Sequence, residues 1–310
     1  MSSVKIFSGS ATKVLAHSIA SNFGCRLGSC KKETFSDGEM GFHFTESVRG
    51  CDVFLLQSTI PPANNIWELL LMIDAARRAS AKYVTVVVPY YGYARQDRKD
   101  KPRVSIAAKL AANVLTSAGA DRIMTCDLHA GQIQGFFDIP VDHLDASAIF
   151  IPYIQRLSLE NLIIASPDVG GTQRARAYAK YFEVDMVVCD KYRKRANEIA
   201  SMQVIGDVKG KDVVLVDDLV DTAGTTSKAG TIIKKKGAKS VRAIATHGVL
   251  SGKAHQNIEE SALEELIITD TIPQKTGSSK VKVLTVAKLF AEAIKKIHDH
   301  ESISSLFIKQ

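Results

Sequence analysis

Short apolar runs rich in β-branched residues alternate with longer segments of helical periodicity along the whole chain. The segments with helical spacing include Trp67–Ala79 and Ser227–Lys236. The strand-like runs are Val53–Gln57, Tyr83–Val88, Leu162–Ala165, Met186–Cys189, Val213–Val216 and Val241–Thr246. Strands that alternate with helices form βαβ units, so this pattern predicts an α/β fold with mostly parallel sheets.

The two halves of the chain resemble one another. RGCDVFLLQS (Arg49–Ser58) matches KGKDVVLVDD (Lys209–Asp218), and residues 6–24 loosely match residues 163–182. At about 100–200 residues per domain, a chain of 310 residues has room for two domains. We therefore predict two copies of one α/β unit, residues 1–146 and 147–310. The alternative is that any two α/β halves share such patterns.

An acidic pair distinguishes the second copy, because Asp217-Asp218 stands where the first copy has Gln57-Ser58. We expect the pair at the carboxyl end of the strand Val213–Val216, where open parallel sheets bind ligands. Carboxylates there can accept hydrogen bonds from the hydroxyls of a sugar. The following segment, Asp221-Thr222-Ala223-Gly224-Thr225, can turn into a helix whose N–H groups bind a phosphate. This predicts a sugar-phosphate site; the alternative is an ordinary strand–turn–helix with an Asp or Thr cap.

The composition narrows the class of protein. A net charge of +7 fits nucleic acid or a small polyanionic substrate, and its spread along the chain without a basic tail favours small phosphates. The five cysteines include no CxxC pair, which argues against a zinc site and fits a reducing compartment. The N-terminus has no apolar signal core, and no run is long enough to span a bilayer. We expect a cytoplasmic protein that binds neither membranes nor nucleic acid.

Several segments together resemble the ribose-phosphate pyrophosphokinase family. They are FSDGE (35–39), YARQDRKDKPR (93–103), CDLHAGQIQGFFDIPVD (126–142), SPDVGG (166–171), KYRKRANE (191–198), VDDLVDTAGT (216–225) and ITDTIP (268–273). The resemblance implies two type I phosphoribosyltransferase-like domains, the first for ATP and subunit contacts and the second for ribose 5-phosphate. It also implies Mg²⁺-dependent transfer of the diphosphoryl group of ATP to the anomeric hydroxyl of ribose 5-phosphate, giving phosphoribosyl diphosphate and AMP.

The resemblance also assigns the nucleotide site, for which the chain offers no GxxxxGK[ST] loop. The ATP-binding residues would be Phe35, Asp37, Gly38, Glu39, Arg95 and Gln96, with Phe35 able to stack on the base. In the family the FSDGE loop reaches ATP on a neighbouring subunit, so a homo-oligomer is implied, commonly a hexamer.

The remaining site residues follow from the same resemblance. His129 and Asp168 would hold Mg²⁺ around the ATP phosphates, with Asp127 and His129 expected together at a strand end. Lys191 and Arg193 would be the catalytic cations, placed in a loop after the strand and closing over the phosphates. The ribose 5-phosphate residues would be Arg193, Asp217, Asp218, Asp221, Thr222, Ala223, Gly224 and Thr225.

The chain departs from the family pattern in two places that concern regulation. Gly131 stands where many members have serine, and the RQDRKDKPRVSIAAKL stretch is one residue shorter than in many members. Both places lie near the family's contacts to regulatory phosphate and ADP. In the family the C-terminal tail, here Ser302–Gln310, packs back on the first domain, with Ser304 and Ser305 as phosphate contacts.

Two other functions are open from the sequence. A phosphoribosyltransferase would consume phosphoribosyl diphosphate and need no ATP, but the doubled domain and the FSDGE and RQD segments argue against it. A non-catalytic synthetase-associated regulatory protein would also resemble the family. The presence of His129, Lys191, Arg193 and the whole of residues 217–225 argues against that alternative.

Overall fold

The computed structural model describes residues 3–192, 201–275 and 277–307. These residues form two compact units. The first unit contains the chain up to Ala146 together with Thr271–Pro273 and Thr285–Phe307. The second contains Ser147–Asp270 and Gln274–Leu284. The chain therefore returns to the first unit after it has built the second.

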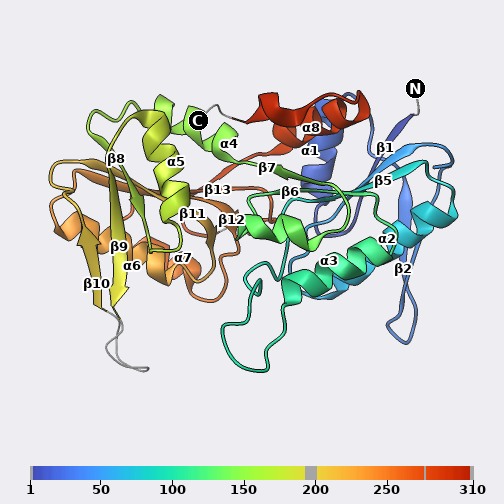
Figure 1. The fold of residues 1–310 in the computed structure, drawn as a ribbon, viewed down its shortest axis with the longest axis horizontal. Helices are drawn as coiled ribbons and strands as arrows, with labels where there is room; N and C mark the ends of the chain where they lie inside the picture. The colour runs from blue at the N-terminus through green and yellow to red at the C-terminus, as the bar shows by residue number, and fades with distance from the viewer. Residues whose placement is uncertain (1–2, 193–200, 276, 308–310) are drawn as a thin grey trace. The chain divides into compact units, whose positions relative to one another are not determined.

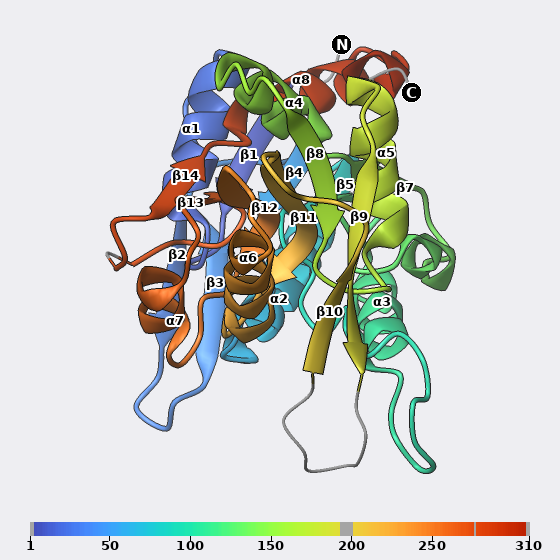
Figure 2. The same ribbon diagram turned by 90° about the vertical axis from the view of Figure 1, so that its left-hand side faces the viewer.

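The first unit is built on a sheet in which every pair of neighbouring strands is parallel. The strand order is β1-β4-β5-β6-β7, with bounds Val4–Ser8, Asp52–Leu56, Tyr83–Val88, Arg122–Cys126 and Val141–Leu144. Helices α1 (Lys13–Phe23) and α8 (Ala287–His298) cover one face of the sheet (Figures 1 and 2). Helices α2 (Asn64–Arg78) and α3 (Ala107–Ser117) cover the other.

Helix α2 forms because its apolar residues recur with helical spacing. Leu69, Met72, Ile73 and Ala76 lie on one stripe and are fully buried against the sheet. The strands of the sheet are apolar on both faces, because both are covered by helices. A separate antiparallel pair, β2 (Cys30–Thr34) and β3 (Met40–Phe44), and the short helices η1 (Gly131–Phe136) and η2 (Ile303–Leu306) complete the unit.

The second unit repeats this plan. Its strand order is β10-β9-β8-β11-β12-β13-β14, and only β10 runs antiparallel to its neighbour. The strand bounds are Ser201–Ile205, Met186–Tyr192, Leu162–Ser166, Asp212–Val220, Ser240–Gly248, Glu265–Thr269 and Val281–Leu284. Its helices are α4 (Ser147–Arg156), α5 (Thr172–Phe182), α6 (Gly224–Lys235) and α7 (Ala254–Glu260). Helix α5 lies on one face of the sheet, and α6 and α7 lie on the other (Figure 2).

The predicted duplication is confirmed by the order of elements. In both units a strand–helix pair is followed by two strands, then by strand, helix, strand, helix and two strands. The units differ in the middle pair, because β9 and β10 extend the main sheet whereas β2 and β3 stand apart. The predicted α/β class with two mostly parallel sheets is also confirmed. Within the described ranges, no helix combines the length and hydrophobicity that a membrane crossing requires.

Candidate functional site

The acidic pair of the second unit lies inside strand β11 rather than beyond its end. The strand runs from Asp212 to Val220, so the prediction that it ends at Val216 was wrong. Strand β8 pairs with β11 only as far as Leu215, whereas β12 continues alongside it to Val220. Pairing with β12 therefore keeps the backbone extended through both acids, which project beyond the end of the shorter neighbour.

The environment of Asp217 disfavours a charged carboxylate. Its pKa is raised to about 8, first by burial and then by the charge of Asp218, a hydrogen bond with Asp218 and the charge of Asp168. The backbone N–H of Asp218 donates to Oδ1 of Asp217 at 2.9 Å and acts in the opposite direction. Asp218 itself is only 9% exposed. The fold thus gathers three acids, from the β8–α5 loop and from β11, around one place.

Three clustered carboxylates are oxygen donors of the kind that Mg²⁺ prefers. Their mutual repulsion is the electrostatic situation that a divalent cation, or hydroxyl donors from a sugar, would relieve. Among the described residues, however, no three His, Cys, Asp or Glu side chains already form a ligand set for a metal. The chemistry of these oxygen donors fits Mg²⁺.

The segment after β11 turns into a helix, as the sequence predicts. Residues 221–223 form the turn and α6 begins at Gly224, with Ala223 in a left-handed conformation at φ 58°. Two contacts from residues far along the chain hold the turn: Ser251 Oγ donates to Asp221, and Asn257 Nδ2 donates to the backbone oxygen of Thr222 at 2.8 Å. The backbone N–H groups at the start of α6 can therefore act as a fixed anion-binding group.

A second tight loop, between β8 and α5, carries Asp168. The N–H of Gly171 donates to Oδ1 of Asp168 at 3.1 Å, and Ser166 Oγ donates to the backbone oxygen of Asp168 at 2.6 Å. A Cβ at Gly171 would lie 2.9 Å from Ser166 Oγ, so the loop closes this tightly only with glycine there. This geometry explains the acid and the glycines of the SPDVGG segment.

The ATP residues predicted from the sequence lie on two surface segments of the first unit. Phe35 to Glu39 form the turn between β2 and β3, where the N–H of Phe35 donates to the oxygen of Glu39 at 2.8 Å. Gly38 has φ 94°, and Asp37 accepts the N–H of Glu39 at 3.0 Å. Arg95 and Gln96 follow β5, where the N–H of Gln96 donates to the oxygen of Tyr93 at 2.9 Å.

A cavity of about 810 Å³ brings part of this set together. Gly38, Glu39 and Tyr93 line it, together with apolar residues of α2 and α3 that include Trp67 and Leu110. Phe35, Arg95 and Gln96 are exposed and are not among its lining residues. Nothing in the sequence alone singled out Trp67 and Leu110, because each falls at an ordinary position of a helical pattern.

The residues predicted to bind metal or to act in catalysis are described less completely by the structure. His129 is exposed in the loop after β6, which ends at Cys126, so the expectation of a strand position was wrong. Asp127 is buried instead and accepts the N–H of Ala146 at 3.3 Å. His129 belongs to the first unit and Asp168 to the second.

Lys191 lies in the backbone of β9, paired with Met202, and not in a loop after the strand as we predicted. Pairing with β10 carries β9 three residues beyond Cys189, where the apolar run ends. Arg193 lies outside the described residues.

Comparison with known proteins identifies the family. A family model described as the N-terminal domain of ribose phosphate pyrophosphokinase matches residues 4–119. A second model, described as the phosphoribosyl synthetase-associated domain, matches residues 192–308.

The relatives align over almost the whole chain. The ribose-phosphate pyrophosphokinase of Porphyromonas gingivalis is 57% identical over 97% of this chain and 97% of its own. The ribose-phosphate pyrophosphokinase of Wolinella succinogenes is 54% identical over 99% of this chain and 100% of its own. The crystal structure of phosphoribosylpyrophosphate synthetase from Mycobacterium smegmatis superimposes with a TM-score of 0.91 at 40% identity, covering 96% of this chain and 99% of that one. The chain therefore belongs to the ribose-phosphate pyrophosphokinase family.

Proposed function

We propose that this chain transfers the diphosphoryl group of ATP to the anomeric hydroxyl of ribose 5-phosphate, giving phosphoribosyl diphosphate and AMP. Family membership over almost the whole chain supports this reaction. The structural observation that carries it is the placing of Asp217 and Asp218 next to the turn at the start of α6. The carboxylate pair can bind the hydroxyl groups of a sugar phosphate, and the neighbouring helix start can bind its phosphate group.

In this proposal the 5-phosphate binds the N–H groups and hydroxyls of residues 221–225, where the helix start favours an anion. Asp217 and Asp218 accept hydrogen bonds from the ribose hydroxyls. The raised pKa of Asp217 supports this role, because hydroxyl donors stabilise the ionised form that burial and the neighbouring acids disfavour. The sugar is thereby oriented with its anomeric hydroxyl free to react.

Transfer itself depends on positioning and charge, because the reacting β-phosphorus carries several negative oxygens. Lys191 and Arg193 supply positive charge to those oxygens, and Arg193 also contacts the sugar phosphate. Asp168 and His129 would hold Mg²⁺, which would neutralise part of the triphosphate charge. The oxygen-rich surroundings of Asp168 support the choice of Mg²⁺.

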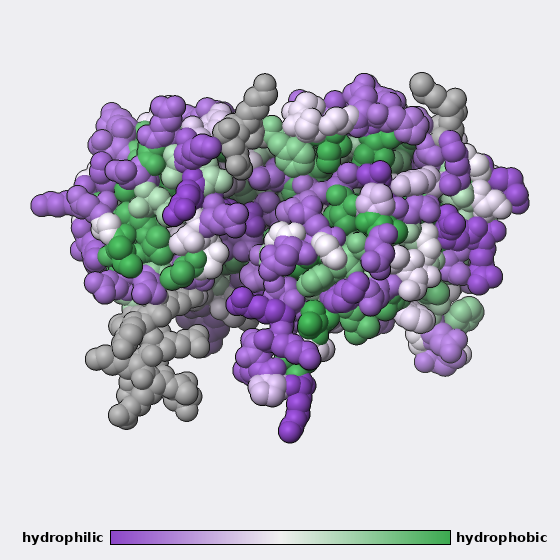
Figure 3. Space-filling model, in the orientation of Figure 1, coloured by the Kyte–Doolittle hydropathy of each residue, from purple (hydrophilic) through white to green (hydrophobic). Residues whose placement is uncertain are grey.

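ATP binds through the β2–β3 turn and the segment after β5, with Phe35 stacking on the base. Phe35 is 53% exposed in the single chain, which supports a role at a surface that another molecule covers. We place a second copy of this chain there, since the apolar Trp67 and Leu110 line the cavity that Gly38 and Glu39 share. A hydrophobic surface over α3 is visible in Figure 3. The assembly would be a homo-oligomer, of the hexameric kind common in the family.

Regulation by phosphate and ADP and a cytoplasmic location complete the proposal. None of the five cysteines, all of which lie in the described part of the chain, forms a disulfide, which supports a reducing compartment.

The test is an assay of AMP release by the purified chain. ATP and ribose 5-phosphate are incubated with Mg²⁺, with and without inorganic phosphate, and AMP and phosphoribosyl diphosphate are quantified. We expect equal amounts of both products, dependent on Mg²⁺ and on the sugar phosphate. Consumption of phosphoribosyl diphosphate with a purine base and no ATP would instead identify a phosphoribosyltransferase. No turnover in either assay would favour the non-catalytic regulatory protein.

A further inference from the structure

The first unit contains the counterpart of the sugar-phosphate site. Gln57 and Asp217 each lie five residues after the first residue of their strands, Asp52 of β4 and Asp212 of β11. The loop Gly9–Thr12 between β1 and α1 stands where the second unit has the Asp168 loop between β8 and α5. Because of the duplication, the first unit has counterparts of both loops of the sugar-phosphate site, one after β1 and one after β4.

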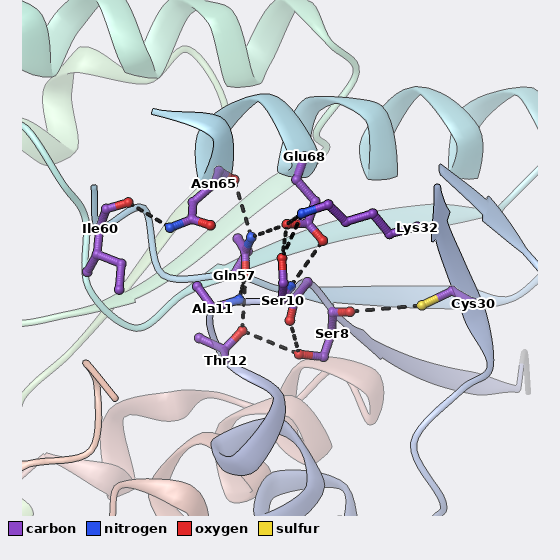
Figure 4. A network of polar contacts seen from close by, with 11 residues as sticks. Ser8, Ser10, Ala11, Thr12, Cys30, Lys32, Gln57, Ile60, Asn65 and Glu68 are labelled. Carbon is purple, nitrogen blue, oxygen red and sulfur yellow. Dashed lines mark hydrogen bonds and ion pairs between the residues drawn. The ribbon is translucent and has the colours of Figure 1, made fainter. Parts of the chain in front are cut away.

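The β1–α1 loop holds a carboxylate from its own chain. The backbone N–H of Ser10 donates to Oε1 of Glu68 at 3.0 Å, and the Ser10 hydroxyl donates to Oε2 (Figure 4). Gln57 Nε2 donates to Oε2 at 3.1 Å, and Lys32 Nζ lies 3.3 Å from the same oxygen. Glu68 is 3% exposed. Backbone N–H, hydroxyl, amide and ammonium donors around one buried anion are the surroundings that a phosphate oxygen finds in a binding loop.

The next backbone N–H of the loop, that of Ala11, also donates to a side chain of the same unit. Ala11 N–H donates to Oε1 of Gln57 at 3.0 Å, and Gln57 itself is fully buried. A Cβ on Gly9 would lie 2.5 Å from the Gln57 side chain, so the loop fits closely around this amide. Gln57 and Glu68 together therefore fill the volume and the donors that a ligand would use.

The second unit differs at the same helix position. Glu68 is the fifth residue of α2, and Lys228 is the fifth residue of α6. Lys228 is exposed, whereas Glu68 points inward to the loop. The first unit also has Pro61 and Pro62 where the second has Asp221 and Thr222. Proline has no backbone N–H, so this turn lacks two donors that could bind a phosphate.

We infer that Glu68 is the built-in occupant of an anion-binding loop retained in the first unit, so the chain carries one site for sugar phosphate. The ligand class of the loop is a small oxyanion, which the Glu68 carboxylate replaces. Removing that carboxylate takes an acceptor away from the buried Gln57 amide and from the donors of Ser10 and Lys32, which lie on exposed residues, and this destabilises the unit. It also leaves a polar space of carboxylate size that formate, acetate or inorganic phosphate can enter.

Anion rescue of Glu68→Ala tests the inference. Thermal unfolding of the full chain is followed in formate, acetate, phosphate and chloride at constant ionic strength. We expect the variant to melt about 5–10 °C below the parent in chloride. The loss should be recovered saturably by an oxyanion, which binds the folded state only. Glu68→Gln is the matched control, because it fills the space and leaves no room for an anion, so its melting temperature should respond to each anion no more than that of the parent. Equal responses of the two variants to every anion would overturn the inference.

A measurement on the unaltered chain keeps the inference testable if Glu68→Ala fails to fold. Equilibrium dialysis with ribose 5-phosphate should give one bound sugar phosphate per chain, lost in the double variant Asp217→Asn, Asp218→Asn. A second equivalent bound per chain that survives this double substitution would overturn the inference. It would leave the proposed reaction unaffected, because that reaction depends on the site of the second unit alone.

Discussion

The backbone N–H of Asp218 donates a 2.9 Å hydrogen bond to Oδ1 of Asp217, while the carboxyl group of Asp218 raises the pKa of that same neighbour. One residue thus both supports and opposes ionisation of the other. Burial and the second and third acids outweigh the single N–H, since the pKa of Asp217 lies at about 8. A bound cation or the hydroxyl groups of a ligand would therefore favour the ionised form of Asp217.

The raised pKa of Asp217 predicts a pH-dependent stability in metal-free protein. The folded state holds this proton up to about pH 8, whereas the unfolded chain releases it near the ordinary value of 3.8. The folded state therefore binds more protons in between, and stability falls as the pH rises through this window. The difference in unfolding free energy between the parent and Asp217→Asn should decline from pH 5 to 8, by at most about 1.4 kcal/mol per pH unit.

Chemical denaturation in the presence of a chelator measures this difference. Asp138→Asn serves as the control, because it removes a carboxylate from a side chain that is 84% exposed. Parallel pH curves for the parent and Asp217→Asn would show that Asp217 is ionised normally in the folded protein.

Replacing both acids, Asp217→Asn and Asp218→Asn, should weaken the binding of ribose 5-phosphate more than the binding of ATP. Each substitution removes a charged acceptor of a hydroxyl, and a hydrogen bond to a charged group contributes about 1.5–3 kcal/mol. We expect the KM for ribose 5-phosphate to rise roughly 10²-fold or more, with the KM for ATP nearly unchanged. Asp207→Asn is a control from the turn before β11, where its carboxylate accepts the N–H of Lys209 at 2.9 Å. Equal rises in both KM values would place the sugar elsewhere.

The spacing of apolar residues correctly predicted the helices and strands whose formation depends on residues close in the sequence. The predicted strand Tyr83–Val88, which is rich in valine, has the same bounds as strand β5. Helix α2 begins at Asn64, three residues before its predicted start. The extension of β11 through its acids could not be predicted, because it depends on pairing with β12, far along the chain. For the same reason the contacts from Ser251 and Asn257 to the 221–223 turn could not be predicted from local pattern. The candidate site residues were predicted from motifs, and the contacts that hold their segments in place are visible only in the folded structure.

Lys191→Ala should lower kcat by about 10²–10⁴, as expected for loss of one donor that acts on transition-state charge. Its position near the end of β9 fixes the backbone, so the loss would reflect charge and not a displaced segment. Lys191→Arg should recover part of the rate. Lys180→Ala, at an exposed position near the end of α5, should leave kcat at the parent value. Turnover near the parent level in Lys191→Ala would remove this residue from the mechanism.

Leu110→Asp should disrupt the assembly that we propose. Leu110 is 60% exposed in the single chain and lines the cavity beside Trp67, so a second copy seated there would have to bury the new charge. Analytical ultracentrifugation should show smaller species for this variant. Val14→Asp changes an apolar residue on α1 that is 83% exposed and does not line the cavity, and should keep the parent distribution. Identical distributions for the two variants would place the subunit contact on another surface.

Gly92→Ala should weaken both the fold and the binding of ATP. A Cβ at this position would lie 2.0 Å from the backbone oxygen of Thr59, and the N–H of Gly92 donates to Thr59 Oγ1 at 2.7 Å. Relieving that overlap has to move the backbone, which costs about 1–3 kcal/mol or more of unfolding free energy. Because Arg95 and Gln96 follow three and four residues later, the KM for ATP should rise while that for ribose 5-phosphate stays close to the parent value. Urea denaturation and steady-state kinetics measure the two effects, and Gly131→Ala is the control, since a Cβ there meets no atom within 4 Å. If Gly92→Ala matched this control in both measurements, the contact with Thr59 would have no part in positioning the ATP segment.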